Sequence, residues 1–370
     1  MKNTLGSSIT ITLFGESHGP AVGVVIDGIA PGLDVDENVI AALLSRRRPS
    51  SSLDTPRQEK DNFQILSGVF NGKTTGTPVC ISIPNENTKS KDYSYGLARP
   101  SHADYTANCK YHGFEDYRGG GHFSGRITAG IVAVGGIFIP ALEKLGITIG
   151  THILKCKDVQ DIPFDTTSDS SIINAQIQTL KTSSFPVLNG AKEEEMAKVI
   201  LSARENCDSV GGITQTAISG LMPGLGEPWF DSIESLINHA MFSLGGVKGI
   251  EFGKGFDFAN ENASTCNDAF RIENNRVITT TNNNGGINGG ISNGMPVIFQ
   301  CAVKPTPSIA QAQNTVDFCK SENAEIKIQG RHDPAIIRRI CPVIDSLTAF
   351  VVCDLITQRF GTDFLARREI

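Results

Sequence analysis

The sequence predicts a mixed α+β fold in which strands and helices form a layered β–α sandwich. Three observations lead to this prediction. Strand-like and helix-like segments alternate along the 370 residues without the roughly 30-residue rhythm of βαβ units. No internal repeat divides the chain, and 39% hydrophobic residues suffice for a substantial core in one large or two ordinary domains. A doubly wound parallel sheet is therefore the less favoured alternative.

The first elements are defined by clear local patterns. Residues 9–14 alternate as a strand, and residues 22–27 form a second, apolar strand after a glycine-flanked turn. Asp36 is placed to cap a helix with apolar residues at helical spacing, and Pro49 ends that helix. The chain should therefore begin as strand, turn, strand and helix.

The remaining elements rest on shorter apolar runs and on helical spacing. Further strands are expected near residues 64–68, 79–83, 148–154, 213–219 and 296–303. Helices are expected at 127–144, 171–182, 193–206, 231–242 and 347–360. The glycine- and asparagine-rich segment 282–294 is too short for a linker and is predicted to be an ordered loop.

Composition excludes several classes of protein. A net charge of −6 opposes a general nucleic-acid footprint, and the nine cysteines show no CxxC spacing and are expected to be reduced. The most apolar stretch, Thr128–Leu142, is too short and glycine-rich for a membrane span. The N-terminus does not resemble a signal peptide, so we expect a cytoplasmic protein. The 38 glycines exceed the usual share and suggest backbone that closely approaches a ligand.

Residues 15–19 spell Gly-Glu-Ser-His-Gly, which matches the GxSxG nucleophile elbow of serine hydrolases. The context argues against that interpretation, because an elbow leads from a strand into a helix, whereas a second strand follows here. Two alternatives stay open for Ser17 and His18. The pair belongs to a structural turn, or it presents a titrating imidazole at a position of close approach.

Arginines gather at the end of the first helix, at positions 46–48, with Arg57 beyond them. Cations at a helix C-terminus are favoured by the macrodipole alone. Guanidinium groups also suit phosphate and carboxylate, which indicates a small anionic ligand. Three consecutive arginines cannot all face the same side, so at most two should converge on it.

The segment 99–126 concentrates three arginines with histidines and aspartates. A metal centre built from these residues lacks a short ligand spacing such as HExxH. The alternative is an anion or cofactor cradle, in which glycines 119–121 precede the N-terminus of a helix. The residues of the metal alternative are His102, His112, His122, Asp104 and Asp116.

Two polar loops near the C-terminus, 304–308 and 331–334, follow or precede rigid elements, where sites are commonly assembled. The sequence contains neither GxGxxG nor GxxxxGK[ST]. A Rossmann or P-loop nucleotide site therefore has little support.

Taken together, these segments resemble the chorismate synthase family. The matching stretches occur in family order from residue 14 to the final helix: 14–19, 46–49, 66–70, 90–93, 99–105, 116–121, 247–251, 284–292, 304–306 and 330–334. The resemblance implies a single catalytic domain over residues 1–370. It also implies a lyase of the shikimate pathway that forms chorismate from 5-enolpyruvylshikimate 3-phosphate by anti-1,4-elimination, requiring reduced FMN without net redox change.

The resemblance further assigns roles to individual residues. His18 would protonate the reduced flavin, and His102 would donate a proton beside the flavin or the departing phosphate. Asp333 would help the flavin N5 act as the base, with Ser17 and Ser124 supporting these proton movements. The candidates for binding the substrate's anions are Arg47, Arg48, Arg57, Arg99, Arg126 and Arg331. The candidates for flavin contact are His122, Phe123, Ser124, Gly245, Gly246, Gly289, Lys304, Pro305, Thr306, Pro307, Ser308 and Arg331.

The sequence departs from the family pattern at two places. After the triple glycine the family usually reads Arg-Ser-Ser-Ala-Arg, whereas this chain has residues 122–126 as His-Phe-Ser-Gly-Arg. Leu53 stands where a basic residue is usual. These departures bear on cofactor affinity and on contact with NADPH, and they leave open whether the chain reduces its own flavin. The resemblance implies a homotetramer. The rival functions are a flavin- or anion-binding protein of weakened activity and a metal-dependent phosphohydrolase.

Overall fold

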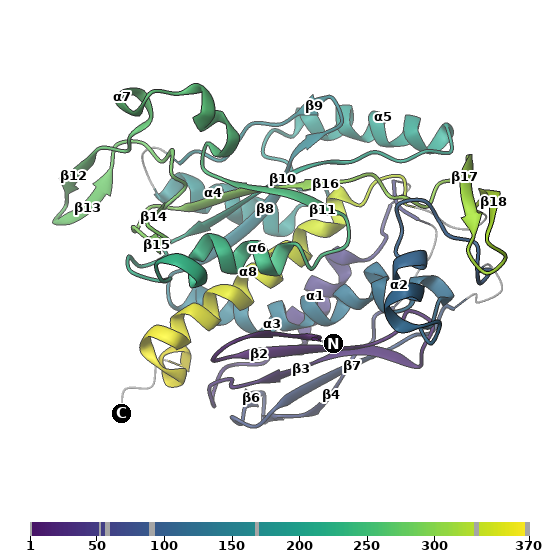
Figure 1. The fold of residues 1–370 in the computed structure, drawn as a ribbon. Coiled ribbons are helices and arrows are strands. Elements are labelled where there is room, and N and C mark those ends of the chain that lie inside the picture. The colour runs from purple at the N-terminus through teal and green to yellow at the C-terminus, as the bar shows by residue number, and fades with distance from the viewer. Residues whose placement is uncertain are drawn as a thin grey trace.

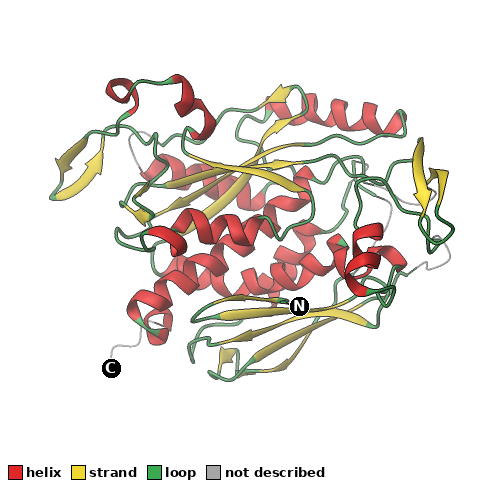
Figure 2. Ribbon diagram, in the orientation of Figure 1, coloured by secondary structure: helices red, strands yellow, loops and turns green. Residues whose placement is uncertain are grey.

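The computed structural model describes residues 2–51, 53–55, 60–88, 93–166, 170–328 and 333–366. Two five-stranded antiparallel sheets enclose a layer of helices (Figures 1 and 2), which confirms the predicted α+β sandwich. The first sheet has the order β1-β2-β3-β7-β4 and the second β11-β16-β10-β8-β9. In Figure 1 the first sheet lies at the bottom and the second above the helices.

The first sheet comes from the N-terminal part of the chain. Its strands are β1 (Thr4–Gly6), β2 (Thr10–Gly15), β3 (Ala21–Asp27), β4 (Gln64–Ser67) and β7 (Val79–Pro84). Strands β2 and β3 pair from Thr10 opposite Asp27 to Gly15 opposite Val22. The short turn between them holds residues 15–19 at one end of the sheet, as the alternating pattern predicts.

The second sheet is built around β10, which pairs with β8 on one side and β16 on the other. Its strands are β8 (Thr148–Cys156), β9 (Val159–Gln160), β10 (Gly212–Ser219), β11 (Val247–Phe252) and β16 (Val297–Val303). Small two-stranded hairpins extend from the body: β5 (Val69–Phe70) with β6 (Lys73–Thr74), β12 (Phe270–Glu273) with β13 (Arg276–Thr279), β14 (Ile287–Asn288) with β15 (Ile291–Ser292), and β17 (Ala312–Asp317) with β18 (Glu322–Lys327).

The helical layer contains α1 (Glu37–Arg47), α3 (Thr128–Lys144), α6 (Ile233–Met241) and α8 (Ile337–Phe360). Helix α1 begins as predicted, because the side chain of Asp36 accepts a hydrogen bond from the Asn38 amide at 2.8 Å. The other helices are α2 (Asp104–Tyr111), α4 (Ser170–Thr182), α5 (Ala191–Glu205) and the short α7 (Ala263–Cys266). Helix α4 covers the second sheet with Ile173, Ile177 and Leu180.

Two sequence predictions about helices were wrong. Helix α8 begins at Ile337, ahead of the expected residue 347, and includes Pro342 in its second turn. Helix α2 was missed because it buries only Ala107 and therefore shows no apolar stripe. Two helical stretches, Gly125–Lys144 and Ile337–Phe360, are long and apolar enough to cross a membrane, but 78% and 100% of their apolar windows are buried inside the protein. Both belong to the core.

A buried carboxyl group, Asp345, lies on α8 within the helical layer. Burial raises its pKa to about 6, because Arg46 at 3.9 Å offsets the desolvation only in part. The folded protein therefore holds this proton more tightly than the unfolded chain, whose value is near 3.8. The stability associated with this proton is complete below pH 4 and is lost as the pH rises through about 6.

Replacing Asp345 with asparagine should thus stabilise the protein at pH 8 by about 1–3 kcal/mol. The gain should shrink toward zero near pH 4, where the native aspartic acid is also neutral. Denaturant unfolding at the two pH values measures both free energies. A variant that is less stable than the native protein at pH 8 would contradict this assignment.

Candidate functional site

A cavity of about 1150 Å³ opens between the two sheets at the end where α1 stops and α8 begins. Its wall brings together segments far apart in sequence: the turn after β2, residues 99–106, residues 119–128, the connection from α6 to β11, residues 304–308, and the start of α8. The predicted residues that line it are His18, Arg47, Arg99, His102, His122, Phe123, Ser124, Arg126, Gly245, Gly246, Lys304, Pro305, Thr306, Pro307, Ser308 and Asp333.

His18 lies on the turn between β2 and β3 and is 9% exposed. Gly119 packs directly against it: a Cβ added at Gly119 would lie 2.4 Å from His18 Cδ2 and 2.5 Å from Nε2. The ring of Tyr93 meets the imidazole edge-on, with centroids 5.4 Å apart. The imidazole is therefore held in one orientation at the cavity wall.

The glycines 119–121 all have positive φ, at 62°, 82° and 52°. This left-handed backbone explains the triple glycine, because side chains disfavour it. The Gly121 carbonyl accepts a hydrogen bond from the Ser17 amide at 3.0 Å, so the glycine turn and the histidine turn are tied together. Ser17 itself is fully buried beside the cavity, and its hydroxyl has no hydrogen-bond partner among the residues that the structure describes.

His102 belongs to a charged trio with Arg99 and Asp104. Its Nδ1 lies 3.0 Å from Asp104 Oδ1 and 3.1 Å from Arg99 Nη2. Burial alone would raise the pKa of Asp104, but the hydrogen bonds from Arg99 and His102 outweigh it and hold that pKa well below its usual range. The carboxylate stays ionised and fixes the imidazole, while Gly120 packs near its Cε1 and Nε2.

His122, Phe123 and Ser124 form the next part of the wall. His122 donates from Nδ1 to the Gly15 carbonyl at 2.8 Å, which fixes its tautomer. The ring of Phe123 is 45% exposed. Ser124 accepts a hydrogen bond from the Arg126 amide at 3.3 Å and caps the short helical turn before α3.

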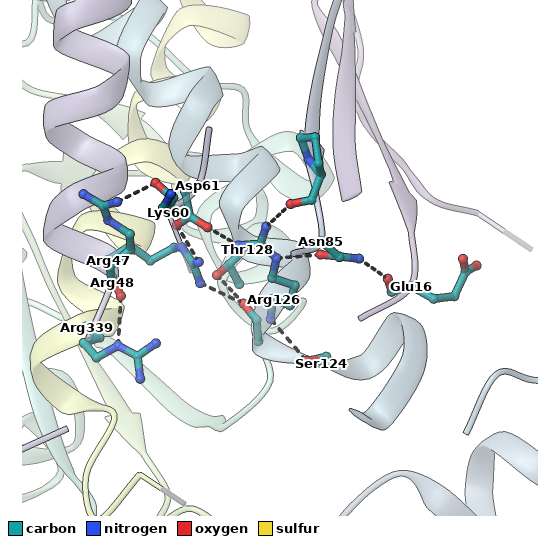
Figure 3. Close-up of polar contacts among 12 residues, drawn as sticks. Glu16, Arg47, Arg48, Lys60, Asp61, Asn85, Ser124, Arg126, Thr128 and Arg339 are labelled. Carbon is teal, nitrogen blue, oxygen red and sulfur yellow. Dashed lines mark hydrogen bonds and ion pairs between the residues drawn. The ribbon is translucent and has the colours of Figure 1, made fainter. Parts of the chain in front are cut away.

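The predicted arginines that the structure describes divide into three groups. Arg47 and Arg126 are buried in the cavity wall, and Asp61 links them (Figure 3). Arg99 lines the cavity beside His102. Arg48, the C-cap of α1, is directed away: it donates to the Lys60 carbonyl and lines a separate, basic cavity with Arg46 and Arg338. Arg57 and Arg331 lie outside the described residues.

Gly289 does not line the cavity and lies instead in the turn between β14 and β15. In Figure 1 this hairpin is at the opposite side of the molecule from α2. The structure therefore gives no support within one chain to its predicted flavin contact.

Several cavity residues, and one residue that contacts the wall from outside the cavity, Asn85, were not predicted. Arg339 donates from Nη1 to Asp333 Oδ1 at 2.6 Å and from Nε to the Arg47 carbonyl at 2.8 Å. Asn85 accepts from Arg126 Nε and donates to the Glu16 carbonyl, so it joins the arginine to the histidine turn. Lys248 and His239 also line the wall. Only Arg339 carried a sequence signal, because it follows the polar loop 331–334 at the start of a helix.

The segment 304–308 forms another part of the cavity wall. Lys304 donates to the Ser101 carbonyl at 2.7 Å, which connects this wall to the loop of His102. Burial, together with the nearby charge of Lys248, lowers the pKa of Lys304. Within the described part of the chain, the buried hydroxyl of Thr306 has no partner, and neither does Nε of Arg47, which also lines the cavity.

Such a site, with fixed histidines, paired arginines and glycine turns around one large cavity in an α+β sandwich, defines an enzyme acting on a small anionic molecule. In the part of the chain that the structure describes, no three His, Cys, Asp or Glu residues are grouped to hold a metal ion.

Comparison with known proteins identifies the family. The chorismate synthase family model matches residues 9–357. The chain is 43% identical to chorismate synthase of Pyrococcus abyssi over 94% of this chain and 96% of that one. It is 42% identical to chorismate synthase of Methanothermobacter thermautotrophicus, over 95% and 93%. A crystal structure of chorismate synthase superposes with a TM-score of 0.76 at 26% identity, covering 98% of this chain and 96% of that chain.

The chain therefore belongs to the chorismate synthase family, the carbon–oxygen lyases that eliminate phosphate from 5-enolpyruvylshikimate 3-phosphate to give chorismate in the shikimate pathway. The resemblance inferred from the sequence motifs is confirmed, as is the mixed α+β fold.

The packing of Gly119 against His18 makes a specific prediction for this activity. Replacing Gly119 with alanine should lower turnover by about 10–100-fold, because the new methyl group must displace the imidazole. Gly146→Ala is the matched control: Gly146 also has a positive φ, of 78°, but open space around its Cβ position. Steady-state rates of the two variants test this, and equal rates would contradict it.

Proposed function

We propose that the cavity binds reduced FMN together with the substrate and that its histidines, Asp333 and arginines carry out the elimination. The observation that supports this most is the convergence of residues from six separate segments on one cavity of about 1150 Å³. That volume exceeds the usual range for a single drug-sized ligand, so it suits a flavin and a substrate side by side.

The residues present fit a flavin in two respects. Gly245 has open space where a Cβ would be, and Phe123 offers an exposed aromatic face at the wall. Thr306 and Arg47 carry buried donors without a partner among the described residues. A planar ring system with a phosphate would use such groups through stacking and hydrogen bonds. His122, Phe123, Ser124, Gly245, Gly246 and residues 304–308 would hold it, and Gly289 and Arg331 stay family-based candidates.

The substrate carries a phosphate and carboxylates, so it needs fixed cations. Arg47, Arg99 and Arg126 are the arginines that the cavity offers for this, and Arg339 adds a fourth. We keep Arg48, Arg57 and Arg331 as candidates on the family resemblance alone. The arginines that line the cavity would stabilise the charge on the departing phosphate, because they are already oriented.

The surroundings of His18 and His102 support a role for each in proton transfer. Reduced FMN, when bound, supplies electron density that assists loss of phosphate and regains it as the ring C–H bond breaks. We assign the role of proton donor to His18, beside Gly119, and to His102, beside Arg99 and Asp104. Asp333, fixed by Arg339 and the Thr55 amide, would help the flavin N5 act as the base that takes the ring proton. Ser17 and Ser124 support these transfers.

We further propose a homotetramer of single-domain chains in the cytoplasm. Exposed aromatic side chains favour self-association: Trp229 is 84% exposed, Phe230 89% and Phe256 82%. The nine cysteines are free thiols, as expected in a reducing compartment. Whether NADPH reduces the flavin on this protein is a separate question, for which the His-Phe-Ser-Gly-Arg sequence at 122–126 is the segment to vary.

Flavin binding is tested by anaerobic equilibrium dialysis with dithionite-reduced FMN. We expect saturable binding by the native protein and about tenfold weaker binding by Lys304→Gln, which loses a cation of the wall. Lys320→Gln, an exposed lysine near the β17–β18 turn, should bind like the native protein. Absence of saturable binding, or equal loss in both variants, would overturn the proposed flavin site.

A further inference from the structure

A buried carboxylate, Asp61, lies behind the arginines of the cavity wall. Its side chain is 0% exposed and bridges Arg47 and Arg126 (Figure 3). One carboxylate oxygen accepts from Arg47 Nη2 at 2.9 Å, and the other accepts from Arg126 Nη1. Both arginines line the cavity, whereas Asp61 does not. Asp61 can therefore affect a ligand only through these two side chains.

Arg47 and Arg126 differ in the hydrogen bonds that they make to groups other than Asp61. Arg126 also donates from Nε to Asn85 at 2.8 Å and from Nη2 to the Pro84 carbonyl at 3.0 Å, so all three of its nitrogens are engaged. Arg47 has a long contact of 3.4 Å to the Gly125 carbonyl, and its Nε has no partner among the described residues. Asp61 is thus the group that fixes the position of Arg47 relative to Arg126.

The charges of this triad are also balanced by Asp61. Burial alone would raise its pKa, but the charges of Arg47 and Arg126 outweigh that effect and hold it below the usual value. Burial lowers the pKa of Arg47, and Asp61 opposes that shift. With Asp61 ionised, the two guanidinium groups present one net positive charge to the cavity instead of two.

The backbone conformation at position 61 restricts which residues can stand there. Asp61 has a φ of +53°, in the left-handed region that costs energy for any residue except glycine. Aspartate and asparagine tolerate this region best among the other residues. Asparagine can therefore replace Asp61 with the same shape and backbone but without its charge.

We propose that Asp61 is a positioning and charge-balancing residue. It fixes the positions of Arg47 and Arg126 relative to each other and lowers their affinity for a phosphate dianion. The inference rests on the proposed role of these arginines in binding the substrate's anions. A dianion must compete with Asp61 for the same guanidinium groups, so product phosphate leaves more readily. The fixed geometry still stabilises charge on the departing phosphate.

The first test measures binding of inorganic phosphate to the full chain by calorimetry, together with kcat. Asp61→Asn should bind phosphate about three- to tenfold more tightly, since one opposing charge is gone. Its kcat should fall about tenfold, because the arginines lose their fixed positions. A purely structural role predicts the opposite sign for phosphate, since a disordered wall binds it more weakly.

Asp34→Asn is the matched control. Asp34 also bridges two cations, Lys73 and Lys144, but it lies on the surface away from the cavity. This variant should change neither phosphate affinity nor kcat.

Asp61→Asn alone leaves two buried arginines without their counter-charge, which can prevent folding. A second comparison therefore keeps the net charge of the native triad. Arg47→Gln leaves a neutral Arg126–Asp61 pair and should weaken phosphate binding about tenfold. Adding Asp61→Asn to it restores one net positive charge, so the double variant should bind phosphate within about threefold of the native protein.

The outcomes distinguish failure of the proposed arginine site from failure of the proposed role of Asp61. If Arg47→Gln binds phosphate like the native protein, the proposed role of the arginines fails. If Arg47→Gln binds more weakly but removal of the Asp61 charge does not tighten binding in either background, the role of Asp61 is refuted while the arginine site stands. Tighter phosphate binding with unchanged kcat would refute the positioning part of the proposal.

Discussion

Replacing His18 with alanine is expected to slow turnover by about 10²–10⁴-fold while the fold is retained. The imidazole is almost buried, and Gly119 and Tyr93 hold it in one orientation at the cavity wall. In its proposed role the imidazole is a positioned proton donor, which water cannot replace with the same geometry. Anaerobic steady-state kinetics measure the loss, and circular dichroism confirms the fold.

A second histidine serves as the control for this variant. His112 caps the end of α2 with a φ of 58° and does not line the cavity. His112→Asn, which tolerates that backbone, should therefore turn over at nearly the native rate. A folded His18→Ala protein within threefold of native activity would contradict the role of His18.

Loss of His102 should have an effect of similar size, about 10²–10⁴-fold in kcat. Its Nδ1 is fixed by Asp104, which Arg99 in turn holds through hydrogen bonds of 2.6 and 2.8 Å. The ring is consequently oriented before any ligand binds.

The same arrangement predicts a smaller loss of kcat when Asp104, which orients the ring of His102, is replaced. Asp104→Asn keeps the imidazole but weakens its orientation, so kcat should fall only about tenfold. Steady-state rates for His102→Ala and Asp104→Asn give this order directly. An equal or larger loss in Asp104→Asn would indicate that the carboxylate acts for another reason, and native activity of His102→Ala would exclude its role.

Much of the architecture follows from local sequence patterns. The Asp36 cap, the strands β2 and β3, and helix α3 were predicted because each satisfies its own pattern of apolar spacing. Hairpins such as β17–β18 carry polar residues on both faces, so their sequences contain no such pattern. The early start of α8 was missed because a proline usually ends a helix, whereas Pro342 lies inside this one.

The sequence predicted site residues only where they belong to recognisable motifs. The histidines and the triple glycine are adjacent to recognisable turns, and the structure brings them to one cavity. The direction of each arginine depends on tertiary packing, which places Arg47 in the wall and Arg48 outside it. Asp61 lies 14 residues from Arg47 and 65 from Arg126, so no spacing rule could join the three.

The most direct test of the whole account is an anaerobic assay with 5-enolpyruvylshikimate 3-phosphate and dithionite-reduced FMN. It records the release of inorganic phosphate and the absorbance of chorismate in the same reaction. We expect both products to appear in equal amounts, in a reaction that depends on reduced FMN and is insensitive to EDTA. Tight binding of flavin without either product, or activity that EDTA abolishes and a divalent ion restores, would contradict it.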